Sequence, residues 1–319
     1  MSRLNFLPNP FFALAPMDDV TDTVFRQIVA KCCKPDLFFT EFVNADGLQS
    51  LGREGVIQKL KFTESDQPII AQIWGLKPEN FYKTARELVE LGFSGVDLNF
   101  GCPDKTVVKN GACSALINNR SLATEIIQAT KEGVSGRASV SVKTRLGFEV
   151  VDLSWAELLL DQGVDMLTIH GRTRKELSKV PAHWEDIGRV RKMRDDKKLP
   201  TLIVGNGDVT SRKHGEELAQ KYSLDGIMIG RGVFNDPFVF SSTSPWQSYS
   251  RQQKIALYSE HVRLFAKIWE KKYRPIRTLN KFCKIYVNGY EGAKGDREKI
   301  MAAVSTDELL LILHEMIQS

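Results

Sequence analysis

The chain has 319 residues, of which 42% are hydrophobic and 26% charged, and this composition is typical of a globular protein with a large core. No apolar run approaches the ~18 residues that a membrane span requires, and the N-terminal segment lacks the pattern of a secretory signal. Five cysteines without metal-type spacing argue against a disulfide framework or a metal site, and they predict a reduced, cytoplasmic protein.

Eight short apolar runs predict β-strands along the first three quarters of the chain. Each run is nearly continuous rather than alternating, as expected of parallel strands that are buried on both faces. The predicted strands are 12–17, 37–42, 69–74, 95–99, 139–144, 166–170, 201–205 and 226–230.

Amphipathic segments between these runs predict helices. In the segment 78–91, apolar residues recur at helical spacing on one side. Further helices are predicted at 121–132, 155–162, 184–195 and 212–222. The eight strand–helix repeats predict an α/β fold, a closed (β/α)8 TIM barrel. A doubly wound open sheet is the alternative, although it would usually have fewer strands.

The pattern changes after Phe240. Residues 241–245 have the composition of a linker, and no strand pattern follows. We therefore expect two domains, a catalytic barrel at 1–243 and a small helical domain at 244–319. The helices predicted in the second domain are 255–271, 277–288, 296–303 and 306–317.

The positive charge of the chain lies in this second domain. Residues 251–319 hold 13 Lys or Arg and 8 Asp or Glu, so the whole net charge of +5 lies there. The basic residues are densest between Arg263 and Lys284. A basic segment beside a neutral body favours a polyanionic partner, and an ordinary solvated helix face is the alternative.

Polar residues end most of the predicted strands, at the side of a barrel where functional residues collect. Gln72, Asn99, Lys143 and His170 are examples, and we interpret these ends as a ligand site. Glycine-containing turns at 205–208 and 230–232 follow the seventh and eighth strands, where barrels commonly bind phosphate through backbone N–H groups. The alternative is that these glycines only permit tight turns.

Three of these side chains suit a flavin. Lys143 could neutralise the electron-rich edge of a reduced flavin, or instead pair with a neighbouring carboxylate. Gln72 carries both a donor and an acceptor, which suits the pyrimidine edge of the ring. His170 could reach phosphate or a flavin oxygen, although a histidine at a strand end is more often structural.

Cys102 follows the fourth predicted strand and precedes a polar loop. A thiol with an ordinary pKa near ~8.5 is mostly protonated at neutral pH and can donate a proton. Its loop position favours a functional cysteine over a structural one. The alternative is a loop cysteine that matters only through packing.

Seven motifs, in order along the chain, resemble the signature of the tRNA-dihydrouridine synthases. They are 15–17 with 20–22, 40–42, 97–103, 141–147, 169–173, 205–208 and 229–232. A weaker similarity at 279–286 is to the helical RNA-binding domain of that family. The chain differs from the family pattern at Cys113, where glycine is usual, at Asp19, where a small residue is common, and at 174–181, which lacks a Tyr-containing turn.

The resemblance implies bound FMN, NADPH as reductant, and reduction of the 5,6 double bond of specific uridines in tRNA. Hydride would reach C6 of the uracil and Cys102 would protonate C5. Asn99 and Arg145 would contact the uracil, and Arg277, Lys281 and Lys284 would contact the RNA. The residues implied for FMN are Pro16, Met17, Asp18, Gln72, Lys143, His170, Asn206, Gly207, Asp208, Gly230 and Arg231.

Two other functions stay open at this point. One is a flavin-dependent barrel that acts on a free small molecule, similar to dihydroorotate dehydrogenase. The other is a nucleic-acid-binding protein that has lost catalysis. The sequence contains no feature that requires a membrane or an obligate protein partner.

Overall fold

A computed structural model of the protein describes residues 4–269 and 273–318. Its internal contacts divide the chain into two units. The barrel unit comprises Met1–Thr23 and Pro35–Gly230, and the helical unit comprises Val24–Lys34 and Arg231–Ser319. The sequence placed the division after residue 243, whereas the structure groups residues 24–34 and 231–243 with the helical unit. The reason is that Phe234 packs against Phe25 and Phe282.

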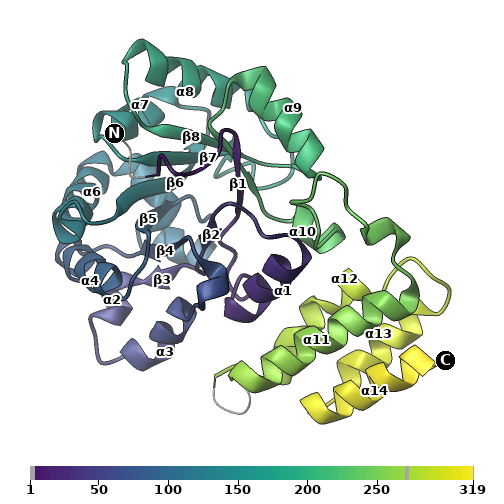
Figure 1. The fold of residues 1–319 in the computed structure, drawn as a ribbon. Helices are drawn as coiled ribbons and strands as arrows, with labels where there is room; N and C mark the ends of the chain where they lie inside the picture. Colours follow the sequence, from purple (N-terminus) through teal and green to yellow (C-terminus); the bar gives the residue numbers. More distant parts are fainter. Residues whose placement is uncertain (1–3, 270–272, 319) are drawn as a thin grey trace. The chain divides into compact units, whose positions relative to one another are not determined.

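The barrel unit is built on one parallel sheet. Its order is β1-β9-β8-β7-β6-β5-β4-β2, with β3 also paired to β4. Backbone hydrogen bonds from Leu14 N to Leu37 O (3.2 Å) and from Asp36 N to Phe12 O (2.9 Å) join the two ends of this order and close the barrel (Figure 1). The strands are β1 Phe11–Leu14, β2 Phe38–Phe39, β3 Val43–Asn44, β4 Ile69–Trp74, β5 Gly95–Phe100, β6 Ser139–Gly147, β7 Met166–Thr173, β8 Leu202–Asn206 and β9 Gly226–Ile229. The predicted (β/α)8 barrel is confirmed.

Of the second predicted strand, 37–42, only Phe38–Phe39 forms a strand (β2), and residues 40–42 divide it from β3, which begins beyond the predicted range at Val43. At the point of division, the backbone N–H of Gln72 in β4 donates to the hydroxyl of Thr40 at 3.1 Å rather than to a backbone carbonyl. The Thr40 hydroxyl in turn donates to the carbonyl of Glu41 at 2.7 Å. A side chain therefore takes the place of a backbone ladder bond and interrupts the strand.

Helices cover the outside of the barrel (Figure 1). In α4 (Pro78–Glu90), Phe81, Ala85 and Leu88 are buried at the predicted spacing, whereas Leu91, predicted on the same side, follows the end of the helix and is exposed. The other long helices are α6 Arg120–Val134, α7 Leu153–Asp161, α8 Trp184–Asp196 and α9 Arg212–Tyr222. Short helices α2 Ala45–Leu48, α3 Arg53–Ile57 and α5 Lys105–Lys109, with the 3-10 turns η1 Gln58–Leu60, η2 Glu64–Asp66 and η3 Cys113–Asn118, lie in the loops.

The inside of the barrel has an apolar part and a polar part. Phe11, Phe39, Ile70, Met166 and Met228 belong to a buried apolar cluster. Side chains two residues apart on a strand share a face, so the strands can also carry a polar layer nearer their C-terminal ends. The cross-strand neighbours there are Gln72 with Asp97, Asn99 with Lys143, Arg145 with His170, and His170 with Asn206.

The helical unit has an aromatic core. The rings of Tyr258 and Tyr286 stack at 4.7 Å, and His261 lies 4.8 Å from Phe282. Its helices are α1 Thr23–Cys33, α10 Gly232–Asn235, α11 Arg251–Trp269, α12 Cys283–Tyr286, α13 Ala293–Ala302 and α14 Thr306–Gln318, with 3-10 turns η4 Trp246–Ser248 and η5 Ile276–Lys281. No helix in the described part of the chain is long and apolar enough to cross a membrane.

One predicted helix of this unit differs from the structure. The helix predicted at 277–288 is the 3-10 turn η5 followed by the short α12. The backbone bonds there, from Phe282 N to Leu279 O and from Ile285 N to Phe282 O, join residues three apart rather than four. Of the helix predicted at 255–271, the last two residues lie outside the described residues.

Candidate active site

The polar layer of the barrel centres on the buried carboxylate of Asp97. It accepts hydrogen bonds from Ser141 Oγ at 2.6 Å and from Gln72 Nε2 at 2.7 Å. Burial raises the pKa of Asp97 to about 6, while these two hydrogen bonds and the charge of Lys143 act in the opposite direction. The two donors hold both carboxylate oxygens in a fixed orientation.

A chain of hydrogen bonds leads from Asp97 to Cys102. The Oε1 atom of Gln72 accepts from Asn99 Nδ2 at 3.0 Å. The Oδ1 atom of Asn99 then accepts from the backbone N–H groups of Gly101 at 3.1 Å and Cys102 at 3.0 Å. The side-chain amides of Gln72 and Asn99 therefore each have a defined orientation. The Asn99 side chain also fixes the turn that carries Cys102. Gln72 and Asn99, which the sequence singled out, lie together here.

Cys102 is half-buried and lines a cavity of about 430 Å³. A hydrogen bond from the Cys113 thiol lowers the pKa of Cys102 to about 7, although its burial acts in the opposite direction. Near neutral pH, Cys102 is therefore present both as the thiol and as the thiolate. The other residues that line the cavity are Asp18, Phe42, Asn44, Val56, Lys59, Trp74, Asp104 and Val107.

Lys143 lies in the same polar layer. The pKa of Lys143 is lowered to about 8, mainly by burial and to a smaller extent by repulsion from Arg145. Lys143 forms no ion pair within 4.0 Å among the described residues, although the charge of the Asp97 carboxylate acts to raise its pKa. On the neighbouring strand, the hydroxyl of Thr168 is buried and has no hydrogen-bond partner in the described part of the chain. A partly desolvated cation and an unpartnered hydroxyl fit an electron-rich ring that accepts hydrogen bonds.

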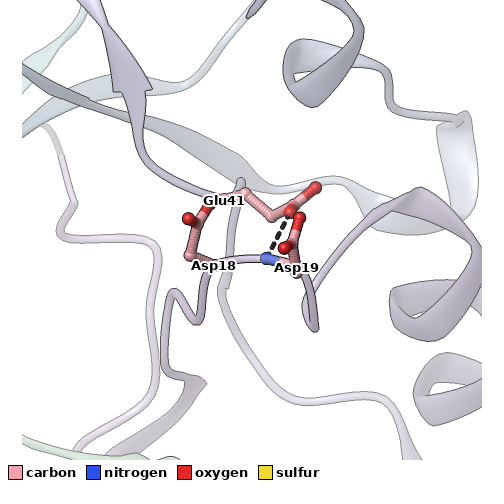
Figure 2. Close-up of side chains that lie close together, drawn as sticks. All are labelled: Asp18, Asp19 and Glu41. Atoms are coloured by element: carbon pink, nitrogen blue, oxygen red, sulfur yellow. Dashed lines mark hydrogen bonds between the residues drawn. The ribbon is translucent and has the colours of Figure 1, made fainter. Parts of the chain in front are cut away.

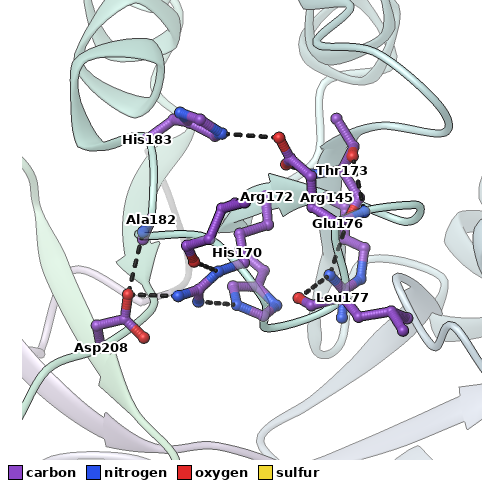
Figure 3. A network of polar contacts seen from close by, with 10 residues as sticks. Arg145, His170, Arg172, Thr173, Glu176, Leu177, Ala182, His183 and Asp208 are labelled. Carbon is purple, nitrogen blue, oxygen red and sulfur yellow. Dashed lines mark hydrogen bonds and ion pairs between the residues drawn. The ribbon is translucent and has the colours of Figure 1, made fainter.

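Arg145 ties the Cys102 turn to the loop after β7. Its Nε donates to Gly101 O at 2.7 Å. Its Nη1 donates to Thr173 O at 3.1 Å and to Leu177 O at 3.2 Å (Figure 3). Burial lowers the pKa of Arg145 to about 10, so it is still a cation at neutral pH. Much of its hydrogen-bonding capacity is therefore used to position loops, which the sequence did not predict.

Arg172 is a site residue to which sequence reasoning assigned no role. Its Nε donates to Val180 O at 2.6 Å, its Nη1 contacts His170 Nε2 at 3.1 Å, and its Nη2 is ion-paired with Asp208 (Figure 3). The guanidinium is always a donor, so Nε2 of His170 accepts and the proton of a neutral imidazole lies on Nδ1. Arg172 is two residues after His170 on β7, and that spacing is the signal that could have found it.

The two predicted phosphate-binding turns differ in the space that they leave for a side chain at their glycines. Gly207 has a φ of +136°, and a Cβ there would lie 2.8 Å from Ala182 Cβ, so glycine is required by the backbone itself. A Cβ at Gly230 would meet only Ala15 Cβ at 3.5 Å and Met17 Sδ at 3.8 Å, which are ordinary contacts.

Two polar side chains of the first turn are engaged with protein. The carboxylate of Asp208 accepts from Arg172 and from Ala182 N (3.0 Å), and Asn206 Nδ2 donates to Met228 O at 2.8 Å. A phosphate at this turn would therefore meet backbone N–H groups rather than the Asp208 carboxylate.

The loop after β1 places Pro16, Met17 and Asp18 at the same end of the barrel. Figure 2 shows Asp18 and Asp19 beside Glu41, whose Oε1 accepts from the backbone N–H of Asp19 at 2.7 Å. The carboxylate oxygens of these three residues lie within 4.8 Å of one another. Asp18 is also ion-paired with Lys59, so this group of acids has a cation of the protein beside it.

Four of the predicted binding residues belong to the helical unit. Arg231 is exposed and precedes α10, at the start of that unit. Arg277 and Lys281 lie in η5 and Lys284 lies in α12, and all three side chains are exposed. The remaining predicted site residues lie in the barrel unit.

Comparisons with known proteins show the family to which the chain belongs. The family model described as "Dihydrouridine synthase (Dus)" matches residues 13–318. The chain is 45% identical over 312 residues to the "Probable tRNA-dihydrouridine synthase 2" of Bacillus subtilis (strain 168), covering 97% of this chain and 94% of that protein. It is equally similar, with the same coverage, to the "Probable tRNA-dihydrouridine synthase" of Staphylococcus aureus (strain COL).

Among solved structures, morphinone reductase has the same barrel fold. It matches with a TM-score of 0.53 and 14% identity over 73% of this chain and 84% of its own. That likeness concerns the fold alone, whereas the sequence relatives and the family model cover nearly the whole chain. The chain therefore belongs to the dihydrouridine synthase (Dus) family of flavin-dependent oxidoreductases.

Proposed function

We propose that this chain is a tRNA-dihydrouridine synthase that uses FMN and NADPH to reduce the 5,6 double bond of specific uridines in tRNA. The printed descriptions of its relatives from B. subtilis and S. aureus support tRNA as the substrate. The observation that carries the proposal is the position of Cys102 relative to a cavity and to Lys143. Cys102 lies on the wall of a cavity of about 430 Å³, and its charge interacts with that of Lys143 in the polar layer. This volume is within the usual range for small-molecule sites.

The residues of the polar layer would hold the flavin. Lys143 would lie against its electron-rich edge, Gln72 would offer hydrogen bonds to its pyrimidine edge, and Pro16, Met17 and Asp18 would contact the ring. Bound FMN, reduced by NADPH, would supply the hydride for C6 of the uracil. Its phosphate would be held by the backbone of Asn206, Gly207, Asp208 and Gly230, with His170 and Arg231 as further donors.

Cys102 would donate the proton that C5 of the uracil requires. Asn99 fixes the backbone of Cys102 through two hydrogen bonds, so the thiol is positioned before the substrate binds. Arg145 would hold the neighbouring loops and use its Nη2 group toward the base. A uridine inside folded RNA must be extruded to reach such a site, at a cost of a few kcal/mol. The aromatic side chains of Phe42 and Trp74 line the space that would receive it.

The rate of dihydrouridine formation should fall as the pH rises above the value of about 7 to which the pKa of Cys102 is lowered, because only the protonated thiol can donate. Cys113→Ala removes the hydrogen bond that lowers this pKa, so the fall should move to higher pH. Single-turnover rates of both proteins across neutral and alkaline pH measure the shift, and superimposable profiles would assign the fall to another group. The other charged groups that act on Cys102 are Asp104, Asp18, Lys143 and Arg145, which this variant leaves in place.

The helical unit would supply the affinity for tRNA through its basic residues. Replacing Arg277, Lys281 and Lys284 with glutamine should weaken tRNA binding. Each of these residues that pairs with a phosphate adds about one unit to the slope of log K against log salt, so the slope should fall by up to about three. Oxidation of NADPH with oxygen as acceptor should persist, because these residues take no part in it.

A matched control for these charges is Lys192→Gln with Lys213→Gln, which removes exposed cations from α8 and α9 of the barrel unit. This control should keep the salt slope of the wild type. Filter binding or fluorescence anisotropy at several salt concentrations gives both slopes. An unchanged affinity and slope in the triple variant would remove the helical unit as the RNA-binding surface.

The proposed reaction can be tested directly. The purified protein, NADPH and unmodified tRNA should yield dihydrouridine at defined positions, detected by mass spectrometry of nuclease digests. tRNA from a strain that lacks the gene should lack the same modifications. If tRNA were not modified while a free pyrimidine was turned over, the chain would instead be a small-molecule oxidoreductase. We further propose that the protein acts in the cytoplasm, where its tRNA substrate is found.

A further inference from the structure

A second cysteine lies against Cys102. Cys113 begins η3, eleven residues further along the chain, and its side chain is buried. The two thiols act on each other, because a hydrogen bond between them lowers the pKa of Cys102 and raises that of Cys113. The two segments are also joined through Ser114, whose hydroxyl donates to Cys102 O at 2.8 Å and whose backbone N–H donates to the same oxygen at 3.4 Å. The two segments that carry the thiols are thus joined by the bonds from Ser114 to the backbone of Cys102.

The backbone at Cys113 is in a conformation that its side chain does not favour. Its φ is +53°, in the left-handed region that glycine adopts most readily. Strain of this kind persists where the surrounding structure imposes it, and it is often found at functional sites. Here this conformation is found at a buried thiol that interacts with the cysteine lining the cavity.

The two thiols differ in acidity, which gives them different chemical roles. The hydrogen bond from Cys113 lowers the pKa of Cys102 to about 7, while the same hydrogen bond and burial raise the pKa of Cys113 well above its ordinary value. Cys102 therefore forms the reactive thiolate, and Cys113 is its protonated neighbour. Elsewhere, burial raises the pKa of Cys32 to about 12 and also raises that of Cys283, so both are poor nucleophiles.

We propose that Cys102 and Cys113 are a redox pair that forms a reversible disulfide when a hydroperoxide oxidises Cys102. In the first step, the Cys102 thiolate attacks a peroxide oxygen, the O–O bond breaks, and a sulfenic acid and water or an alcohol are formed. In the second step, Cys113 attacks the sulfur of the sulfenic acid, its proton leaves with the hydroxyl as water, and the S–S bond forms. The two thiols lose two electrons in total and the peroxide gains them.

The disulfide would have two consequences for the site. Cys102 would carry no proton to donate, so dihydrouridine formation would stop; this part rests on the proposed function. The thiol would also be protected, because a sulfenic acid that is captured by a neighbouring thiol does not proceed to the irreversible sulfinic acid. A dithiol reductant would restore both thiols.

The test is to treat the purified full-length protein anaerobically with hydrogen peroxide and then map its peptides without reduction. We expect a linked peptide that contains Cys102 and Cys113, the loss of two thiols per chain, loss of tRNA reduction, and recovery of both on treatment with dithiothreitol. In Cys113→Ala the same peroxide treatment should instead convert Cys102 to sulfinic acid, and dithiothreitol should not restore activity. Cys113→Gly, which suits the φ of +53°, is a second variant with the same expected outcome.

The matched control is the double variant Cys32→Ala and Cys33→Ala, which retains the redox pair and should behave as the wild type. The proposal is overturned if no peptide linking Cys102 to Cys113 forms, or if oxidised Cys113→Ala and Cys113→Gly recover as fully as the wild type. The peptide map does not depend on activity. A linked peptide in a protein whose Cys102→Ala variant still modifies tRNA at the normal rate would refute the proton-donor role while leaving the disulfide in place.

Discussion

Replacing Cys102 with alanine is expected to slow dihydrouridine formation by about 10²–10⁴-fold, the usual cost of losing a general acid. Hydride and proton must reach the uracil at adjacent carbons, and Cys102 is the thiol that lines the cavity. The variant should retain FMN, should still be reduced by NADPH and should bind tRNA nearly as the wild type does. The measurement is the single-turnover rate of dihydrouridine formation under anaerobic conditions, near neutral pH.

The control for this variant is Cys113→Ala, on the same loop. Cys113 is buried and its pKa is raised, so it has no assigned proton to give, and its removal acts only through the pKa of Cys102. Near neutral pH its rate should stay within about tenfold of the wild type. A wild-type rate for Cys102→Ala, or a greater loss for Cys113→Ala than for Cys102→Ala, would show that the acid has been assigned to the wrong residue.

Replacing Gly230 with leucine is expected to give a folded but colourless protein. The amount of bound FMN should fall from one per chain to nearly none. A Cβ at this position meets only ordinary contacts with Ala15 and Met17, so the fold should tolerate the change. The rest of the leucine side chain would fill the space that a phosphate needs to approach the backbone N–H groups of this turn. Flavin absorbance of the purified protein, together with its thermal melting, measures both effects.

The structure favours Gly230 over Gly207 for this test. Gly207 has a φ of +136° and a Cβ would lie 2.8 Å from Ala182, so loss of flavin in a Gly207 variant would not separate phosphate binding from local strain. Gly55→Leu is the matched control, because a Cβ there meets nothing within 4 Å. It should purify with a full complement of FMN. Stoichiometric FMN in Gly230→Leu would exclude this turn as the phosphate site.

The sequence by itself determined the elements whose signal is local. The strand β4 and the helix α9 lie at the bounds that the apolar pattern predicted, Ile69–Trp74 and Arg212–Tyr222. The reason is that burial of one or both faces imposes a period on neighbouring residues, which can be read without knowing their partners. The eight repeats then implied the barrel, and the barrel implied that polar strand ends such as Gln72 and Lys143 would meet.

The tertiary structure alone decided the contacts between residues that are distant in the sequence. The strand predicted at 37–42 ends at Phe39 because the hydroxyl of Thr40 meets a backbone N–H of β4, and Arg145 reaches carbonyl groups on two other segments. The thiols of Cys102 and Cys113 act on each other's pKa although they are eleven residues apart in the sequence, and the backbone at Cys113 has a positive φ. Such contacts depend on barrel register and on the path of each loop, and no local period in the sequence encodes either.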